Sequence, residues 1–268
     1  MQKSSSLYGD AFYAGHMAGS YRSARLYSEC LSRVYSPGSV VDVGCGRGAW
    51  LKAFKESGAS RLLGFDGVWN SQQMMIEDSL VFKACDLNKP ILSDERFDLA
   101  MSLEVAEHLE PASAETFVKS LIGLSDVVMF GAAFMEQGGA SHLNERENSY
   151  WAGLFASHQY LAFDIFRPVF WGDKRVEPWY QQNTFLYVRK DSGAMATIAS
   201  KGISPISNLG FMDCLHPDLY LYRSQNGIGF IRRVQRKLDA LKTFMKRGKE
   251  PGRQPSTVNK DMTEPSNI

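Results

Sequence analysis

The stretch from Ser39 to Gly58 constrains the fold of this 268-residue chain more than any other. Residues 39–43 read Ser-Val-Val-Asp-Val, and so many β-branched residues favour a buried β-strand. Glycines at alternate positions follow at once, and then Leu51 and Phe54 recur at helical spacing before the closing Gly58. A strand, a glycine turn and a helix open a doubly wound α/β sheet, which binds its ligand beyond the carboxyl end of the strand.

The glycine turn is compatible with two kinds of ligand. Gly44, Gly46 and Ala49 fit the relaxed dinucleotide fingerprint Gly-x-Gly-x-x-Ala, and Asp66 stands where that fingerprint needs an acid for a ribose. Asp42, however, places a carboxylate at the end of the strand, and this charge repels a pyrophosphate. S-adenosylmethionine (SAM) has a sulfonium, an ammonium and no phosphate, so the acidic turn favours SAM over NAD.

The longer pattern Asp-x-Gly-x-Gly-x-Gly at residues 42–48 closely resembles motif I of class I SAM-dependent methyltransferases. The resemblance implies a Rossmann-like, seven-stranded α/β sheet that is mostly parallel with an antiparallel last strand. We expect strands at residues 39–43, 61–67, 80–87, 96–103, 126–131, 162–171 and 183–188. The resemblance also implies SAM as cofactor, bound by Asp42, Gly44, Gly46, Gly48, Asp66, Asp86, Leu87 and Glu104. In this set Asp66 holds the ribose, while Asp86 and the backbone amide of Leu87 hold the adenine.

An acidic turn with a histidine follows the fourth expected strand. If this turn is helical, Glu104, Glu107 and His108 share one face. The turn resembles the Glu-x-x-Glu-His of ubiquinone-pathway O-methyltransferases and small-RNA 2′-O-methyltransferases, where these residues can hold a divalent ion. Three interpretations stay open: a metal site with His142 as fourth ligand, metal-free positioning or general-base work, and a structural role. Metal-free work is favoured, so the four residues are catalytic candidates and no metal is assigned.

A second motif lies in the loop after the fifth expected strand. The pattern Gly-Gly-x-x-His-x-Asn-Glu followed by Tyr-Trp resembles a bacterial subgroup of class I methyltransferases that is often linked to glycan or secondary-metabolite modification. Its matching positions are Gly138, Gly139, His142, Asn144, Glu145, Tyr150 and Trp151, and the likeness covers about residues 7–190. The subgroup more often has Gln-Trp-Pro where this chain has Arg-Glu-Asn at residues 146–148. His142 is the best candidate for a general base, because an imidazole accepts protons near neutrality.

Composition changes divide the chain into four segments. Residues 1–37 are expected to form a helical segment that either packs across the sheet or acts as a lid over the cofactor. Residues 38–190 form the SAM-binding domain, and residues 191–249 form a helical appendage. Its end, residues 231–249, has eight basic residues and one acid, which suits an anionic membrane surface or a partner. Residues 250–268 are expected to be disordered.

The overall charge and the cysteines narrow the function further. A formal net charge of +1 argues against nucleic acid as a partner. The four cysteines have neither metal-binding spacing nor a disulfide framework, and we see neither a signal peptide nor an apolar run that could span a membrane. We therefore expect a cytoplasmic protein, with its oligomeric state left open.

These features together predict a SAM-dependent O-methyltransferase. The acceptor is expected to be a hydroxyl of a sugar, a polysaccharide or another small molecule, methylated by in-line transfer. One alternative is an NAD(P)-dependent oxidoreductase, which would use the same glycines. The other is a non-catalytic SAM-binding or partner-recruiting module.

Overall fold

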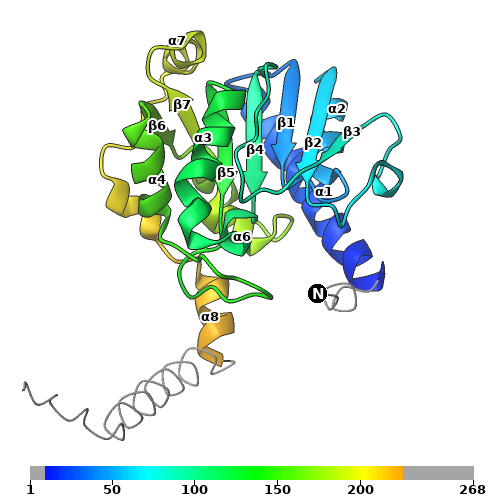
Figure 1. Ribbon diagram of the computed structural model, residues 1–268. Coiled ribbons are helices and arrows are strands. Elements are labelled where there is room, and N and C mark those ends of the chain that lie inside the picture. Colours follow the sequence, from blue (N-terminus) through cyan, green and yellow to red (C-terminus); the bar gives the residue numbers. More distant parts are fainter. Residues whose placement is uncertain (1–9, 226–268) are drawn as a thin grey trace, which may run out of the picture. The chain divides into compact units, whose positions relative to one another are not determined.

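One sheet of seven strands organises the chain, for which the computed structural model describes residues 10–225 (Figure 1). The strand order is β3-β2-β1-β4-β5-β7-β6. The strands are β1 (Ser39–Val43), β2 (Arg61–Asp66), β3 (Val81–Ala84), β4 (Leu99–Leu103), β5 (Val127–Gly131), β6 (Tyr160–Phe163) and β7 (Phe185–Arg189). The first five strands pair in parallel, and β7 lies antiparallel between β5 and β6. This arrangement confirms the expected Rossmann-like sheet with an antiparallel last strand.

The central strands are buried on both faces, so their side chains alternate between two cores. Val41 and Phe130 contribute to the core on one face, whereas Val40 and Met129 contribute to the core on the other. Such strands read as continuous apolar runs because helices cover both sides of a parallel sheet. Burial on both faces explains why the valine-rich stretch before the glycine turn forms a strand.

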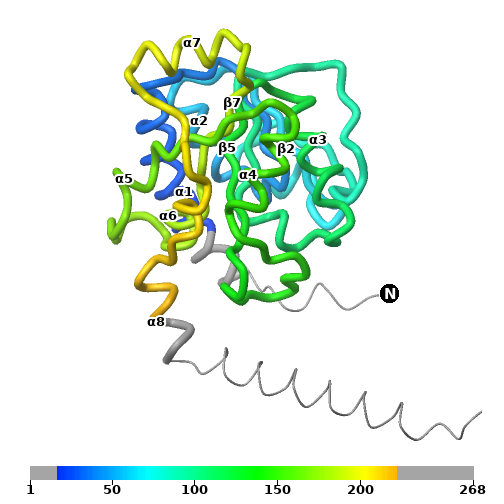
Figure 2. Tube along the Cα trace, turned by 90° about the vertical axis from the view of Figure 1, so that its left-hand side faces the viewer, coloured from blue at the N-terminus to red at the C-terminus, as the bar shows by residue number. Residues whose placement is uncertain are grey.

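Helices flank the sheet on its two faces. In Figure 2, α1 (Asp10–Ser32) and α2 (Ala49–Glu56) lie on one side of the strands, and α3 (Ala114–Leu124) and α4 (Asn148–Ser157) on the other. The remaining helices are α5 (Arg167–Phe170), α6 (Pro178–Asn183), α7 (Gly193–Ser200) and α8 (Pro217–Gln225), with 3₁₀ helices at Gln72–Met74, Ala106–His108, Pro111–Ser113 and Leu209–Asp213. Because α2 begins directly after the glycine turn, its N-terminus faces the carboxyl ends of β1 and β4, where the strand order reverses.

The strand expected at residues 162–171 is wrong beyond Phe163. The strand β6 ends at Phe163, and residues Arg167–Phe170 form the short helix α5. Pro168 occupies the first turn of α5, where a missing N–H is tolerated, whereas it could not donate to a sheet ladder. The guanidinium of Arg167 also donates to Asp164 and to the carbonyls of Phe211 and Met212, which holds the chain in this bend.

The compact unit that contains the sheet does not end at residue 190, because the chain after β7 packs against it. Among the described residues, the main compact unit extends to Tyr222. Asn148 Nδ2 donates to the carbonyl of Met212, and the amide of Ser149 donates to Asp213, so the 3₁₀ helix Leu209–Asp213 packs on α4. The basic stretch 231–249 and the tail 250–268 lie outside the described residues. Within residues 10–225, no helix has the length and apolar character needed to cross a bilayer.

Candidate active site

The glycine turn after β1 is left-handed at three positions. Gly44 has φ +91°, Gly46 has φ +51° and Gly48 has φ +86°, a region in which L side chains are strained. A Cβ at Gly44 would lie 2.3 Å from Cγ2 of Val105, so the turn packs closely against the chain after β4. A Cβ at Gly46 would instead have no described heavy atom within 4 Å. The turn therefore opens to solvent at Gly46, where a ligand can approach the backbone.

Asp66, at the end of β2, braces this turn. Its Oδ2 accepts a hydrogen bond from the amide of Gly46 at 2.7 Å, and its Oδ1 accepts one from the amide of Gly67 at 2.7 Å. Burial raises the pKa of Asp66, and these amide bonds oppose the rise. The carboxylate stands at the edge of the glycine turn, as a ribose-binding acid would, and each oxygen keeps acceptor capacity for a hydroxyl.

Asp42 lies in β1 and is only 4% exposed. Its burial and the neighbouring charge of Asp66 raise its pKa well above the ordinary value of a carboxyl. A nearby cation would lower that pKa and so would be bound favourably. The charge argument for a cationic cofactor at Asp42 stays a prediction.

The next strand end adds an exposed acid. Asp86 follows β3 and accepts a hydrogen bond from the amide of Asn88 at 3.0 Å, which lowers its pKa. The amide of Cys85 donates to the carbonyl of Asp66 at 2.8 Å, so the ends of β2 and β3 stay together. Leu87 is buried. The assignment of Asp86 and Leu87 to adenine stays a prediction.

The chain after β4 does not form the expected helical turn. Glu104 has φ +57°, and the 3₁₀ helix Ala106–His108 begins only after it, so the residues do not share one helical face. The left-handed residue breaks the i, i+3, i+4 pattern. The carboxylate of Glu104 accepts hydrogen bonds from Asn183 Nδ2 at 3.0 Å and from Gln137 Nε2 at 3.2 Å. Burial nevertheless raises the pKa of Glu104 to about 7.

Glu107, His108 and His142 come together instead. One ligand-type atom from each lies within 4.8 Å of the others, and the two imidazole rings meet edge to face with centroids 4.8 Å apart. Glu107 is 1% exposed, and neither carboxylate oxygen has a well-formed hydrogen bond among residues 10–225. Burial and then the charge of Glu104 raise the pKa of Glu107, and burial lowers that of His108. Glu104 lies outside this trio.

His142 is held by Glu145 in the loop after β5. His142 Nδ1 and Glu145 Oε1 are 2.8 Å apart, and the amide of Gly138 donates to the same oxygen at 2.7 Å. Burial opposes the charge of Glu145, yet the bonds from His142 and Gly138 lower its pKa overall. A Cβ at Gly139 would lie 2.2 Å from His142 Nε2, so the paired glycines make room for the ring. The motif in the sequence thus encodes a positioned histidine.

Two functional candidates escaped the sequence analysis. Gln137 and Asn183 reach Glu104 from positions 33 and 79 residues away. A run of amide side chains at residues 181–183 was the only local signal. Amides of this kind are common in loops, so their meeting with a glutamate becomes visible only in the fold.

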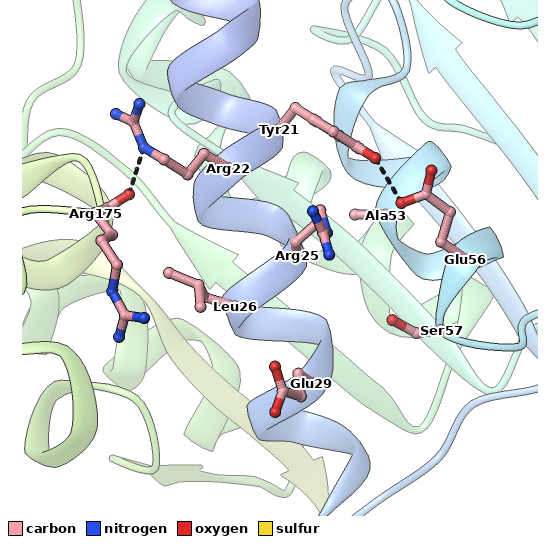
Figure 3. A pocket seen from close by; sticks show the side chains of 9 residues that line it. All are labelled: Tyr21, Arg22, Arg25, Leu26, Glu29, Ala53, Glu56, Ser57 and Arg175. Atoms are coloured by element: carbon pink, nitrogen blue, oxygen red, sulfur yellow. Dashed lines mark hydrogen bonds between the residues drawn. The ribbon is translucent and has the colours of Figure 1, made fainter.

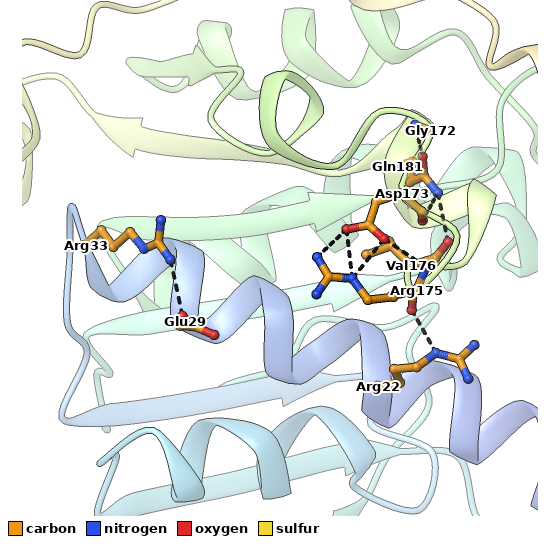
Figure 4. Close-up of polar contacts among 8 residues, drawn as sticks. All are labelled: Arg22, Glu29, Arg33, Gly172, Asp173, Arg175, Val176 and Gln181. Atoms are coloured by element: carbon orange, nitrogen blue, oxygen red, sulfur yellow. Dashed lines mark hydrogen bonds and ion pairs between the residues drawn. The ribbon is translucent and has the colours of Figure 1, made fainter.

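A separate surface pocket of about 440 Å³ lies along α1 (Figure 3). There Tyr21 Oη donates to Glu56 at 2.5 Å, and Arg22 Nε donates to the carbonyl of Arg175 at 2.8 Å. Figure 4 shows the Arg175 guanidinium paired in turn with Asp173. The pocket adjoins the C-terminal half of α2, whereas the glycine turn precedes the N-terminus of that helix. A lid function of residues 1–37 stays a prediction.

Comparisons with known proteins agree with this geometry. Residues 13–124 match a family model described as a methyltransferase domain. Among solved structures, the fold is similar to that of SAM-bound CalS10, an amino pentose methyltransferase from Micromonospora echinaspora. The identity is 13% and the TM-score 0.51, over 69% of this chain and 99% of that one. No curated protein sequence matches the chain.

A second solved structure with a similar fold is an O-methyltransferase family protein from Burkholderia thailandensis. The identity is 15% and the TM-score 0.51, over 69% of this chain and 60% of that one. At such low identity these structures support the fold alone, whereas the family match covers the glycine turn and the strand end of Asp66. Residues 13–124 therefore belong to a class I SAM-dependent methyltransferase domain, for which SAM is the cofactor.

Proposed function

We propose that the protein transfers the methyl group of SAM to a hydroxyl oxygen of a sugar, a glycan or another small molecule. The observation that carries this proposal is the contact of His142 with Glu145, because a carboxylate-bound imidazole can take the proton of an alcohol. The same proposal makes the protein an enzyme and not merely a SAM-binding or partner-recruiting module.

The cofactor is assigned to the glycine turn after β1. The turn formed by Asp42, Gly44, Gly46 and Gly48 holds the methionine end, Asp66 the ribose, and Asp86 with Leu87 the adenine. The open space at Gly46 and the buried carboxyl group of Asp42 support this placement. Glu104 stands beside the turn, because Val105 packs on Gly44. This contact supports the assignment of Glu104 to the charged end of SAM.

The chemistry needs alignment and one proton transfer. The acceptor oxygen attacks the methyl carbon in line with the sulfonium, the carbon–sulfur bond breaks, and S-adenosylhomocysteine (SAH) leaves with the electron pair on sulfur. The hydroxyl proton passes to Nε2 of His142, while Nδ1–H donates to Glu145 and fixes the tautomer. His108 packs against the ring of His142, and partial burial lowers the pKa of His108.

A metal-assisted form of the same reaction is the second candidate. Glu107, His108 and His142 offer one carboxylate and two imidazoles, and the buried carboxylate of Glu107 lacks a well-formed hydrogen bond among the described residues. This donor set fits a divalent transition ion, which would polarise the acceptor oxygen. Dialysis against a chelator followed by addition of Zn²⁺ or Mn²⁺ separates the candidates, since the metal-free reaction keeps its rate after dialysis.

The acceptor class rests on the Gly-Gly-x-x-His-x-Asn-Glu motif. A sugar hydroxyl is the first choice, in line with that motif. A phenol is the second choice, since its pKa of about 10 makes its proton easier to remove. We keep the cytoplasm as the proposed location, and residues 231–249 as a proposed contact with a membrane surface or a partner. Nucleic acid is not proposed as an acceptor.

The test uses labelled SAM and candidate glycans, sugars and phenols, with label transfer followed by mass spectrometry. His142→Gln should lose at least 100-fold in kcat, in line with the usual contribution of a general base. His158→Gln is the matched control, because His158 lies at the end of α4. If His142→Gln keeps full activity on a true hydroxyl acceptor, the general-base assignment is wrong.

A further inference from the structure

We propose that Gln137, Gln182 and Asn183 form an amide clamp, a set of positioning side chains that present Glu104 as a fixed, charged acceptor for the methionine ammonium of SAM. No family match covers these three amides, which lie outside residues 13–124. The inference rests on the proposed assignment of Glu104 to the cofactor.

Both carboxylate oxygens of Glu104 are engaged by the clamp. Oε1 accepts from Asn183 Nδ2 at 3.0 Å, and Oε2 accepts from Gln137 Nε2 at 3.2 Å. Donors on both oxygens leave the carboxylate one orientation, and each donor stabilises the ionised form. The remaining lone pairs stay available to a cationic ligand.

The direction of the amides is set by the main chain. The amide of Phe134 donates to Gln137 Oε1 at 3.1 Å, and the amide of His216 donates to Gln182 Oε1 at 2.7 Å. A backbone N–H can only donate, so each of these side chains must offer its oxygen to the backbone and its NH₂ group to the next partner. The main chain therefore fixes which end of the Gln137 and Gln182 amides faces the next partner.

The bonds among the three amides in turn orient Asn183 toward Glu104. Gln182 Nε2 donates to Asn183 Oδ1 at 3.1 Å and lies 3.3 Å from Gln137 Oε1, and Asn183 Nδ2 also donates to Gln137 Oε1 at 3.0 Å. With its oxygen occupied in this way, Asn183 keeps its NH₂ group toward Glu104. Gln182 and Asn183 are each 1% exposed, so water does not compete for these bonds.

The backbone at Glu104 supports the same conclusion. A non-glycine residue at φ +57° is strained and persists only where its surroundings hold it, and such residues cluster at functional sites. Here the amide of Glu104 donates to the carbonyl of Gly131 at 2.9 Å. A Cβ at Gly131 would lie 3.0 Å from the carbonyl oxygen of Asn183, so β5 and the end of α6 meet closely beside the clamp.

Burial and the clamp act on Glu104 in opposite directions. Burial raises its pKa, the bonds from Asn183 and Gln137 and then the charge of His142 lower it, and the net result is a pKa of about 7. Removing a donor should therefore raise the pKa further and leave more Glu104 protonated at pH 7. A protonated Glu104 cannot pair with an ammonium, so cofactor affinity should fall at pH 7 and recover as the pH rises.

The test is calorimetry with SAM and with SAH between pH 6 and pH 9. For Asn183→Leu we expect at least tenfold weaker binding of both compounds at pH 7, with the loss shrinking toward pH 9. Both compounds carry the ammonium, so an equal loss identifies that group, whereas a loss for SAM alone would assign Glu104 to the sulfonium and overturn the proposal. Comparison with the wild-type protein at each pH removes the titration of the cofactor itself.

Matched variants keep the test decisive if Asn183→Leu folds poorly. Gln182→Met removes the directing amide without touching Glu104, and we expect about threefold weaker binding with the same pH dependence. Gln181→Leu is the control, since this buried neighbour bonds Gly172, Asp173 and Val176 and not Glu104. An equal loss in Gln181→Leu, or a loss that does not change with pH, would refute the clamp. This experiment measures only cofactor binding. A negative result would therefore leave the proposed hydroxyl acceptor and the proposed role of His142 unaffected.

Discussion

Replacing Gly46 by alanine should remove cofactor binding while the protein stays folded. A left-handed alanine costs about 1 kcal/mol, and the lower entropy of the unfolded chain offsets ~0.4–1 kcal/mol of it. Gly46 has φ +51°, and no described heavy atom lies within 4 Å of the added Cβ, so no clash adds to this cost. The added methyl group projects into the open space where SAM is proposed to approach the turn. We expect the Kd for SAM to rise at least tenfold, which is about 1.4 kcal/mol.

Gly58→Ala is the matched control for this prediction. Gly58 has φ +106° and likewise no described heavy atom within 4 Å of an added Cβ, but it lies beyond the C-terminal end of α2. Urea titrations should give both variants a free energy of unfolding within about 2 kcal/mol of the wild-type value. Calorimetry should show weaker SAM binding for Gly46→Ala only. Gly44→Ala should differ from both, because its Cβ would lie 2.3 Å from Val105 and should destabilise the protein even without SAM. Equal SAM affinity in the Gly46 and Gly58 variants would refute the placement of the cofactor.

Three further predictions follow from buried charges. Glu145→Gln should lower kcat about tenfold or more with little change in the Kd for SAM, because His142 loses the negative charge that stabilises its protonated ring; stopped assays with a true acceptor measure this, and an unchanged kcat would contradict it. Glu107 has a raised pKa in the folded state, so folding binds protons and the free energy of unfolding should fall as the pH rises above about 4.5. Glu107→Gln should remove that fall and be more stable than wild type at pH 8 but similar at pH 4, as urea titrations at the two pH values would reveal. Arg167→Met should cost about 3 kcal/mol or more, because it leaves the carbonyls of Phe211 and Met212 and the carboxylate of Asp164 without their donor; a change in urea midpoint worth under 1 kcal/mol would show that the bend after β6 does not need this residue.

The local pattern of residues 39–58 determined the strand, the glycine turn and the helix from which the sheet is built. A valine-rich strand, three left-handed glycines and a helix can be read from sequence because each depends on neighbours only a few residues away. The acid before the glycines added the charge argument for SAM, and the Gly-Gly-x-x-His-x-Asn-Glu pattern drew attention to His142, whose contact with Glu145 became visible in the structure. Short range made the strand, the turn and the helix predictable.

Only the tertiary structure decided the remaining features. Residues 167–170 carry apolar and aromatic side chains that suit a strand, yet Pro168 and the contacts of Arg167 with residues 211–212 make them a helix. Glu104 was expected on a helical face with Glu107, but a left-handed backbone held by β5 separates the two. The amide clamp joins β4, the loop after β5 and the end of α6. Hydrogen bonds over 33 and 79 residues form only after the sheet has aligned these strand ends, which no local pattern can encode.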